Sequence, residues 1–473
     1  MKSNYLKKNK YNILFLLLII SISLVMMIFM RVDSDYFWHI TAGKYMVNHH
    51  TILTHDIFSW FVNGKYWMSH EWLFEVIIYY MSIIFGKYHL LIYGIINVLI
   101  ILFIFYFTNK EQFHKNKVFG LIWLFLFFIF YGFMVGRPQL ISNILLALTV
   151  YILMDLYNNK NSRKIYFLPL ITIIWANVHG GSSNLPYILS FVFMFISLIK
   201  FDIGKINSLR KSKRQILTFL IVALICMLCV NINPHGFKMF IYPYINMGNS
   251  LMLNTISEWQ PTVLSNNSHL SYYMFIFFIL MILLFSKKKI RLIDFCLFMI
   301  SIYLGLKSIR FWGYTYIIMT YVVFNYIHPR EDDRGTDSIL LILSCLFIFI
   351  FGMSFKNIIK ATNDKLISDK MINIIKHENP QRLYNDYGIG GYLIYNNIEV
   401  FIDGRADLYS DYNYRDNIDI MYYKKNFYNK FYKYDFDYLL VSEGFQINTY
   451  LKNNSNYKLI YKEGKYLFYK KVS

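Results

Sequence analysis

The chain has 473 residues, of which 56% are hydrophobic and 20% aromatic, and its mean hydropathy is +0.37. This composition indicates an integral membrane protein and excludes an ordinary soluble domain. The formal net charge of +20 lies mostly in short loops between apolar segments. That is the pattern of membrane topology, so we expect no nucleic-acid partner.

The first apolar segment, residues 11–30, follows a lysine-rich start and is about long enough to cross a bilayer. No small-x-small cleavage site follows it, so we expect an uncleaved signal anchor rather than a removed signal peptide. The 4 cysteines all lie inside apolar runs. We expect buried thiols there, rather than a zinc site or a disulfide.

Residues 72–107 allow two topologies. If the segment forms two membrane spans, the basic loops that follow it lie outside the cell. An interfacial helix at 72–85, a break at Gly86-Lys87 and one span at 89–107 keep every later basic loop inside, as the positive-inside rule favours. Further spans are then expected at residues 118–134, 139–157, 165–177, 185–199, 216–230, 272–285, 292–306, 311–327 and 339–353.

The predicted fold is an α-helical polytopic membrane protein with about eleven spanning helices, a cytoplasmic N-terminus and a small extracytoplasmic C-terminal α/β domain. The transmembrane domain comprises residues 1–354, with the first external loop at 31–87, and the extracytoplasmic domain comprises 355–473. In that domain we expect helices at 363–377 and 411–431, strands at 382–386, 392–395, 400–403 and 438–441, and a closing hairpin at 457–469.

This topology, set by charge alone, places the polar motifs together at the outer ends of the spans. The inner loops hold mainly lysine, asparagine and serine, and every tryptophan except Trp123 lies on or near the outer side. An interfacial aromatic belt would populate both faces, so the imbalance indicates an external site. The motif residues are Asp33, Asp35, His70, Glu71, Trp72, Arg137, His179, His235, Glu258 and Arg310.

Asp33 and Asp35 follow the first span directly. Asp35 stands where an N-cap of the helix predicted at 36–47 belongs, which needs no catalysis to explain it. Two acids beside Trp38 and His39 at a membrane boundary also suit a general base. His39 lies one turn after Asp35 on the same helix face, where it could orient the acid or ligate a cation.

His70-Glu71-Trp72 closes the same loop at the start of the next helix. It can be a simple helix start, with Glu71 favoured by the helix dipole. With Asp35 and His39, Glu71 could instead complete a Mg²⁺ or Mn²⁺ site.

The other outer groups are mostly cations, including Arg137, His179, His235, Lys238 and Arg310. Each has a simple alternative, because Arg137 can snorkel and the neighbouring glycines and prolines can merely break helices. As a set they suit an anionic, phosphate-bearing substrate. In the C-terminal segment, Arg405 and Asp407 follow the predicted strand 400–403. They either pair with each other or face the membrane site and touch its substrate.

The first loop resembles that of the GT-C polyprenyl-phosphate glycosyltransferases, which include protein O-mannosyltransferases and lipid A aminoarabinose transferases. The shared order is an acidic pair (Asp33-Ser-Asp35), a helix, the stretch Asn63-Gly64-Lys65-Tyr66-Trp67 and a helix ending at Phe85-Gly86. It departs at His70-Glu71-Trp72-Leu73, where many relatives have a Lys-Pro-Pro-Leu-like run. The tail motifs Gly390-Gly391-Tyr392-Leu393 and Asp403-Gly404-Arg405-Ala406-Asp407 resemble an uncharacterised prokaryotic branch of such proteins.

The resemblance implies an enzyme of the cell membrane that takes a sugar from a polyprenyl-phosphate-linked donor. Transfer would occur outside the cell with inversion, with Asp33 or Asp35 as the base, and the acceptor would be an extracytoplasmic glycan, lipid or protein. A flippase for lipid-linked glycans would use the same cations without a base. An O-antigen-type polymerase or ligase would differ only in its lipid-diphosphate-linked oligosaccharide donor, and a non-catalytic assembly partner is a further alternative.

Overall fold

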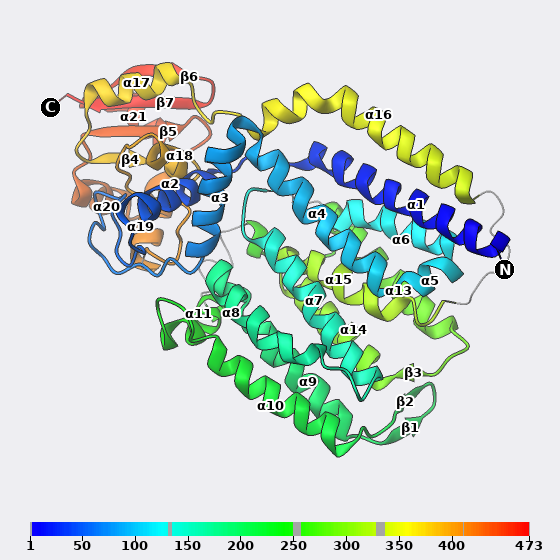
Figure 1. Ribbon diagram of the computed structural model, residues 1–473. Helices are drawn as coiled ribbons and strands as arrows, with labels where there is room; N and C mark the ends of the chain where they lie inside the picture. Colours follow the sequence, from blue (N-terminus) through cyan, green and yellow to red (C-terminus); the bar gives the residue numbers. More distant parts are fainter. Residues whose placement is uncertain (1, 131–134, 249–256, 328–335, 410, 473) are drawn as a thin grey trace. The chain divides into compact units, whose positions relative to one another are not determined.

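The computed structural model describes residues 2–130, 135–248, 257–327, 336–409 and 411–472 (Figure 1). Its internal contacts divide the chain into two compact units. The first unit holds Met1–Arg31 and Leu90–Thr362, and the second holds Val32–His89 and Asn363–Ser473. The second unit therefore groups the first loop with the C-terminal segment, whereas the sequence places the loop in the transmembrane domain.

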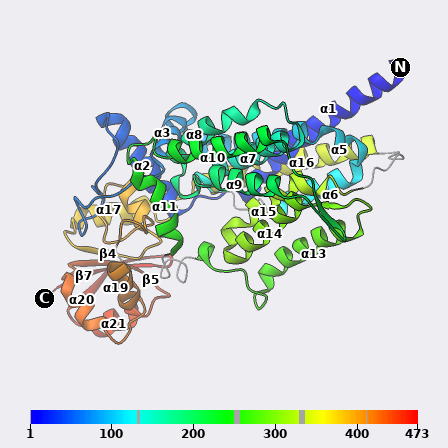
Figure 2. The same cartoon turned by 90° about the horizontal axis from the view of Figure 1, so that it is seen from below.

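The first unit is built mainly of apolar helices. Helix α16 packs along α1, and α7, α8, α9 and α10 pack side by side (Figure 2). The helices are α1 (Lys2–Val25), α4 (His89–Thr108), α5 (Lys110–Lys115), α6 (Lys117–Phe130), α7 (Gln139–Asn158), α8 (Leu168–Val178), α9 (Leu185–Leu198), α10 (Lys213–Cys229), α11 (Phe237–Gly248), α13 (Leu270–Phe285), α14 (Leu292–Lys307), α15 (Trp312–Val323) and α16 (Thr336–Thr362), with short 3-10 turns η1 (Met26–Phe29), η3 (Lys164–Phe167), η4 (Gly180–Ser182), η5 (Ser257–Trp259), η6 (Asn267–His269) and η7 (Ile309–Phe311).

Each predicted span coincides with a helix of the described residues, although residues 131–134 of the span at 118–134 lie outside them. By length and composition, 6 helical segments of the described chain could cross a membrane. They are Tyr11–Phe29, Trp72–Thr108, Gln139–Asn158, Gly180–Leu198, Asn267–Phe285 and Ser338–Thr362. The number of about eleven spans and their orientation stay predictions.

The predicted break at Gly86 is confirmed. Helix α3 (Trp72–Phe85) ends there, and the 3-10 turn η2 (Gly86–Tyr88) leads into α4. Gly86 has φ 52° and ψ −132°, a conformation that residues with a Cβ rarely adopt. The turn of Gly86, Lys87 and Tyr88 therefore separates two apolar helices.

The first unit also contains a small sheet that the sequence does not predict. Strands β1 (Phe201–Ile203) and β2 (Ile206–Ser208) form an antiparallel hairpin, and β3 (Ile290–Arg291) pairs in parallel with β2. The strands have only two or three residues each, too few to show an alternating pattern. Lysines within and around them make the segment read as an ordinary inner loop.

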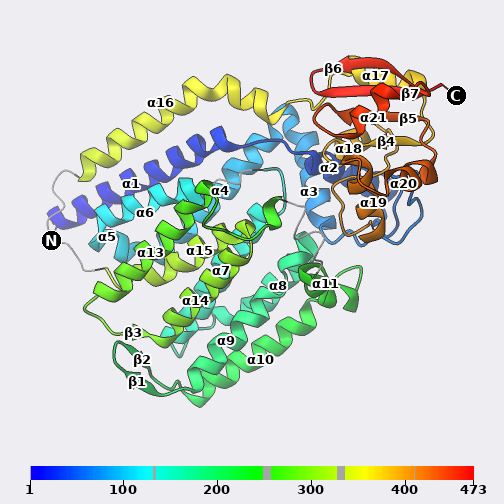
Figure 3. The same ribbon diagram turned by 180° about the vertical axis from the view of Figure 1, so that it is seen from behind.

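The second unit combines short helices with a 4-stranded sheet of order β4-β5-β7-β6 (Figure 3). The first pair is parallel and the other two are antiparallel. The strands are β4 (Leu383–Asn385), β5 (Tyr438–Ser442), β6 (Tyr457–Glu463) and β7 (Tyr466–Lys471), and the helices are α2 (Ser34–His49), α3, α17 (Asp369–Glu378), α18 (Gly390–Tyr395), α19 (Asp411–Met421), α20 (Phe427–Tyr434) and α21 (Ile447–Asn453). The strands predicted at 382–386 and 438–441 and the closing hairpin are confirmed.

The strand predicted at residues 392–395 is wrong, because this segment lies in α18. A short apolar run does not by itself distinguish strand from helix. Helix α18 packs on α2 so closely that a Cβ on Gly391 would lie 2.0 Å from the Ser34 carbonyl oxygen. The expected strand at 400–403 reduces to a single bridge between Val400 and Ser59. Ser59 belongs to the first loop, which is distant from Val400 in the sequence.

Two predicted helices have different limits. Helix α17 begins at Asp369 instead of residue 363, because the Ser368 hydroxyl caps it by accepting from the Met371 amide at 3.2 Å. The helix expected at 411–431 is divided into α19 and α20. Tyr423, which has φ 49°, lies in the break.

The N-cap of α2 is Asp33, so the assignment of this role to Asp35 is wrong. Asp33 has extended backbone angles, and its Oδ1 accepts from the Tyr36 amide at 3.0 Å. Asp35 lies in the first turn of α2. A carboxylate there interacts favourably with the helix dipole but does not cap the helix.

We expect Asp33→Ala to lower the free energy of unfolding of the second unit by about 1 kcal/mol, because the cap is lost. Asp33→Asn should leave it nearly unchanged, because asparagine caps a helix as well as aspartate. Thermal unfolding of the purified full-length chain checks both. Equal destabilisation by the two variants would contradict the capping role.

Candidate functional site

The best-defined ionic site of the second unit is centred on Arg405, which is 1% exposed. Its Nη2 and Nε donate to the two carboxylate oxygens of Asp403 at 2.6 and 2.9 Å, and its Nη1 donates to Asp56 Oδ1 at 2.6 Å. The guanidinium carbon lies 4.7 Å from the ring centroid of Trp67. Arg405 therefore joins the C-terminal segment to the first loop.

The carboxylates around Arg405 are themselves held by other donors. Asp56 accepts from the amides of Phe58 and Ser59 at 3.2 and 3.0 Å, and Asp403 accepts from the Tyr409 hydroxyl at 2.6 Å. A buried charge is tolerated when it is paired and hydrogen-bonded in this way. Of the two roles the sequence leaves open for Arg405, this geometry supports a structural one, with Asp403 and Asp56 as partners instead of Asp407.

A second group in this unit is a chain of alternating carboxylates and imidazoles, which we call the acid–histidine cluster. It comprises Glu75, His39, Glu71, His70 and Asp407. His39 lies 3.3 Å from Glu71 and 3.4 Å from Glu75, and His70 lies 3.3 Å from Glu71 and 3.8 Å from Asp407. Glu75 also accepts from the Ser69 hydroxyl at 2.8 Å.

The cluster runs from a closed end to a more open one. The side chains of Glu75 and His39 are 0% and 2% exposed, whereas those of His70 and Asp407 are 15% and 14% exposed. Burial alone would lower the pKa of His70, but Glu71, Asp407 and Glu75 outweigh it and raise that pKa above its ordinary value.

The two predicted base candidates are both half-buried. Asp33 uses one oxygen as the cap of α2. Asp35 lies against the backbone of Gly404, where a Cβ on residue 404 would come within 1.6 Å of Asp35 Oδ1. Only glycine fits there without displacing the carboxylate, so the loop that carries Arg405 also fixes the place of Asp35.

The divalent-cation site proposed for Asp35, His39 and Glu71 stays a prediction. Among the described residues, no group of three His, Cys, Asp or Glu side chains has the spacing to hold a metal ion. Of the expected ligands, His39 and Glu71 are in contact with each other as an ion pair. We therefore assign no chemical step to Mg²⁺ or Mn²⁺.

In the first unit, four predicted residues meet in a second site, which we call the arginine cluster: Arg137, Glu258, Arg310 and His179. Arg137 Nη1 donates to both oxygens of Glu258 at 3.1 and 3.2 Å, and Arg310 Nη1 donates to Glu258 Oε1 at 3.2 Å. Their side chains are 18–23% exposed. The cluster places two guanidinium groups on one carboxylate and stays partly open to its surroundings.

The hydrogen bonds fix the state of His179. Arg310 Nη2 lies 3.2 Å from His179 Nε2, and a guanidinium can only donate, so Nε2 accepts. The ring proton is therefore on Nδ1, which donates to the Ser142 hydroxyl at 2.6 Å. Trp175 Nε1 donates a hydrogen bond to the same Ser142 hydroxyl at 3.1 Å. In this tautomer His179 Nε2 accepts from Arg310 and helps to orient it.

The structure also describes three further predicted residues, His235, Lys238 and Trp72. His235 is buried in the turn before α11, and its amide donates to Asn233 Oδ1 at 2.7 Å. Lys238 is exposed on α11, which packs against η4 next to His179. Trp72 is half-buried at the start of α3.

Several residues of these sites were not singled out from the sequence. Glu75 could have been identified from the sequence, because it is a lone acid within the apolar helix 72–85. Asp56 and Ser142 could not have been identified in this way, because each is an ordinary polar residue whose partner lies far along the chain.

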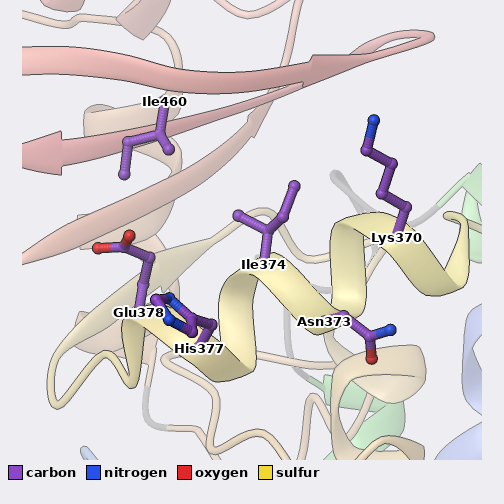
Figure 4. A pocket seen from close by; sticks show the side chains of 6 residues that line it. All are labelled: Lys370, Asn373, Ile374, His377, Glu378 and Ile460. Atoms are coloured by element: carbon purple, nitrogen blue, oxygen red, sulfur yellow. The ribbon is translucent and has the colours of Figure 1, made fainter.

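A shallow groove of about 570 Å³ also lies in the second unit, between α17 and β6. Figure 4 shows Ile374 pointing from α17 toward Ile460 on the strand, with Lys370 and His377 along the helix. None of the predicted site residues lines it.

Replacing Arg405 by methionine should lower the free energy of unfolding by about 3–5 kcal/mol, because two buried carboxylates lose their partner. Arg382→Met removes an exposed pair with Asp435 and should have little effect on the melting temperature. Thermal unfolding of both variants gives the comparison. Equal melting temperatures would show that the buried ion pairs do not hold the unit together.

The raised pKa of His70 makes stability depend on pH. Its contribution is complete below the ordinary histidine pKa and is lost as pH rises through the raised one. The melting temperature of the wild type should therefore fall over that window, and His70→Gln should remove this part of the fall. His377→Gln alters an exposed histidine and should keep it. An unchanged pH profile in His70→Gln would contradict the assignment.

No family model and no curated protein matches this sequence. Among solved structures, the chain is similar to the oligosaccharyltransferase of Archaeoglobus fulgidus in its apo form. The match has a TM-score of 0.55 and 13% identity, and it covers 92% of this chain and 69% of the other. At this identity the likeness concerns the fold alone.

Proposed function

We propose that this protein is a membrane glycosyltransferase that moves a sugar or oligosaccharide from a lipid-phosphate-linked donor to an extracytoplasmic glycan, lipid or protein. The observation that carries the proposal is the arginine cluster, in a chain whose fold resembles that of an oligosaccharyltransferase. The predicted topology puts its four members on the outer side.

The arginine cluster suits a phosphate-bearing leaving group. Arg137 and Arg310 are held in place by Glu258, and Arg310 also by His179 and by the ring of Trp259, 4.9 Å from its guanidinium carbon. Guanidinium groups bind phosphate oxygens through paired, charge-assisted hydrogen bonds. Groups fixed in advance stabilise the charge that develops as the donor breaks.

The proposed base is Asp33 or Asp35, as the resemblance of the first loop implies. The acceptor oxygen attacks the anomeric carbon, a new C–O bond forms, and the bond from that carbon to the phosphate oxygen breaks. The lipid phosphate leaves with the electron pair, and the acceptor proton passes to the carboxylate of Asp33 or Asp35. Attack opposite to the leaving group inverts the anomeric configuration.

Two alternatives keep the same anion site. A lipid-diphosphate-linked oligosaccharide donor would make the protein a polymerase or ligase, and the oligosaccharyltransferase fold likeness favours this over a flippase. A flippase moves the lipid-linked glycan without breaking a bond and needs no base.

We expect Asp33→Asn or Asp35→Asn to lower transfer at least about a hundredfold, the usual contribution of a general base. The assay offers membranes radiolabelled polyprenyl-phosphate sugars and polyprenyl-diphosphate oligosaccharides. Asp33→Asn is informative because it keeps the helix cap. Asp364→Asn, at an exposed acid, is the matched control and should transfer like the wild type.

In the same assay, Arg310→Gln should raise the KM for the donor and lower the rate, whereas Arg382→Gln, at an exposed arginine, should not. Transfer that is unaffected by both aspartate variants contradicts the base assignment. If the lipid-linked substrate crosses the membrane and no covalent product forms, the protein is a flippase and the transferase proposal is wrong.

A further inference from the structure

The second unit carries an exposed group of aromatic rings outside the sites described above. Tyr423, Tyr428, Tyr432 and Tyr450, which we call the tyrosine platform, come from the break after α19, from α20 and from α21. Tyr428 and Tyr432 are 50% and 55% exposed. Exposed aromatic residues are usually scattered singly, and a contiguous set of them marks a contact surface.

The rings of the platform are held in fixed orientations. The hydroxyls of Tyr423 and Tyr428 lie 2.6 Å apart, and those of Tyr432 and Tyr450 lie 2.8 Å apart. The rings of Tyr428 and Tyr432 are stacked, with 14° between their planes. Phe427 is buried against Tyr450, with ring centroids 4.7 Å apart. The hydroxyls therefore bond to one another, and ring surface is left exposed.

The backbone at Tyr423 is unfavourable for a tyrosine. Its φ of 49° is a left-handed conformation, which glycine or asparagine adopts most readily after a helix. A bulky residue in this region is uncommon and strained. The Tyr423 ring nevertheless packs against Phe427 and Tyr450, with ring centroids 4.6 and 6.0 Å apart.

The charge around the platform is positive. Lys424, Lys425 and Lys452 are exposed beside it. Lys424, Lys430 and Lys433 share the two carboxylates of Asp416 and Asp419, so the remaining positive charge lies chiefly on Lys425 and Lys452. The excess of lysine at the rim favours a partner that carries negative charge.

We propose that the tyrosine platform binds an anionic glycan, with sugar rings stacked on the tyrosine faces and carboxylate or phosphate groups on the rim lysines. The C–H face of a pyranose is apolar and flat, so it suits an aromatic face. Its hydroxyls can bond to the neighbouring side-chain amides of Asn426 and Asn429, both of which are exposed. Binding needs no donor lipid and does not depend on the proposed transfer.

A membrane surface is the less favoured partner. Side chains that enter the headgroup region are typically Trp, Phe and Leu, whereas both phenylalanines of α20 are buried under the tyrosines.

Affinity electrophoresis of the full-length chain in detergent tests the proposal. Native gels contain polygalacturonate (a carboxylate glycan), phosphomannan (a phosphate glycan) or neutral dextran. At least one anionic polysaccharide should retard the wild type more than dextran does, and less so at high salt. Tyr428→Ala with Tyr432→Ala should weaken binding about tenfold, the order expected for losing stacked rings. The matching Tyr→Phe pair should bind nearly as well.

Tyr395→Ala, at a tyrosine that is 49% exposed but outside the platform, is the control and should bind like the wild type. Two results would overturn the proposal: no retardation of the wild type by either anionic polysaccharide, or equal retardation of the wild type and the double alanine variant. A third arm mixes the chain in nanodiscs with phosphatidylglycerol vesicles. Capture that is lost in the alanine variant would identify a lipid surface and also overturn the glycan assignment.

Discussion

Arg405 has to be buried and charged at once, and this constraint organises the second unit. Taking an ion out of water costs several kcal/mol even after the protein relaxes, and Asp403 and Asp56 offset that cost. Nearby, Trp60 Nε1 donates to the Leu383 carbonyl and Lys65 Nζ to that of Leu408, at 3.0 and 2.6 Å. Because Gly404 and Asp407 flank Arg405, its fixed position also places Asp35 and the open end of the acid–histidine cluster.

The two units differ in the chemistry that they offer. In the first unit, Arg137 and Arg310 share the single carboxylate of Glu258, which reduces their mutual repulsion and keeps both groups oriented. In the acid–histidine cluster of the second unit, the two histidines lie between carboxylates. Paired guanidinium groups suit an anion, whereas neighbouring carboxylates and imidazoles suit the exchange of a proton. A base in a strongly cationic site would be a weaker proton acceptor.

The apolar helices could be predicted because long apolar runs determine them locally, and the break at Gly86 followed from charge and one glycine. Elements whose conformation depends on a distant partner could not. Residues 392–395 are helical because Gly391 packs on Ser34, and Val400 bridges to Ser59. The motif around Arg405 was visible, but its partner Asp56 was not. The choice of Asp33 over Asp35 as the cap depends on backbone angles that either acid could adopt.

The pairing of Asp56 with Arg405 also constrains how the protein is made. The two residues are separated by 349 positions, and every helix of the first unit from α4 onward is translated between them. At ribosomal rates of ~5–20 residues per second, Asp56 waits roughly 20–70 seconds for its counterion. During biogenesis the nascent loop is therefore an unfinished half-domain, whose folding is coupled to completion and insertion of the whole polypeptide.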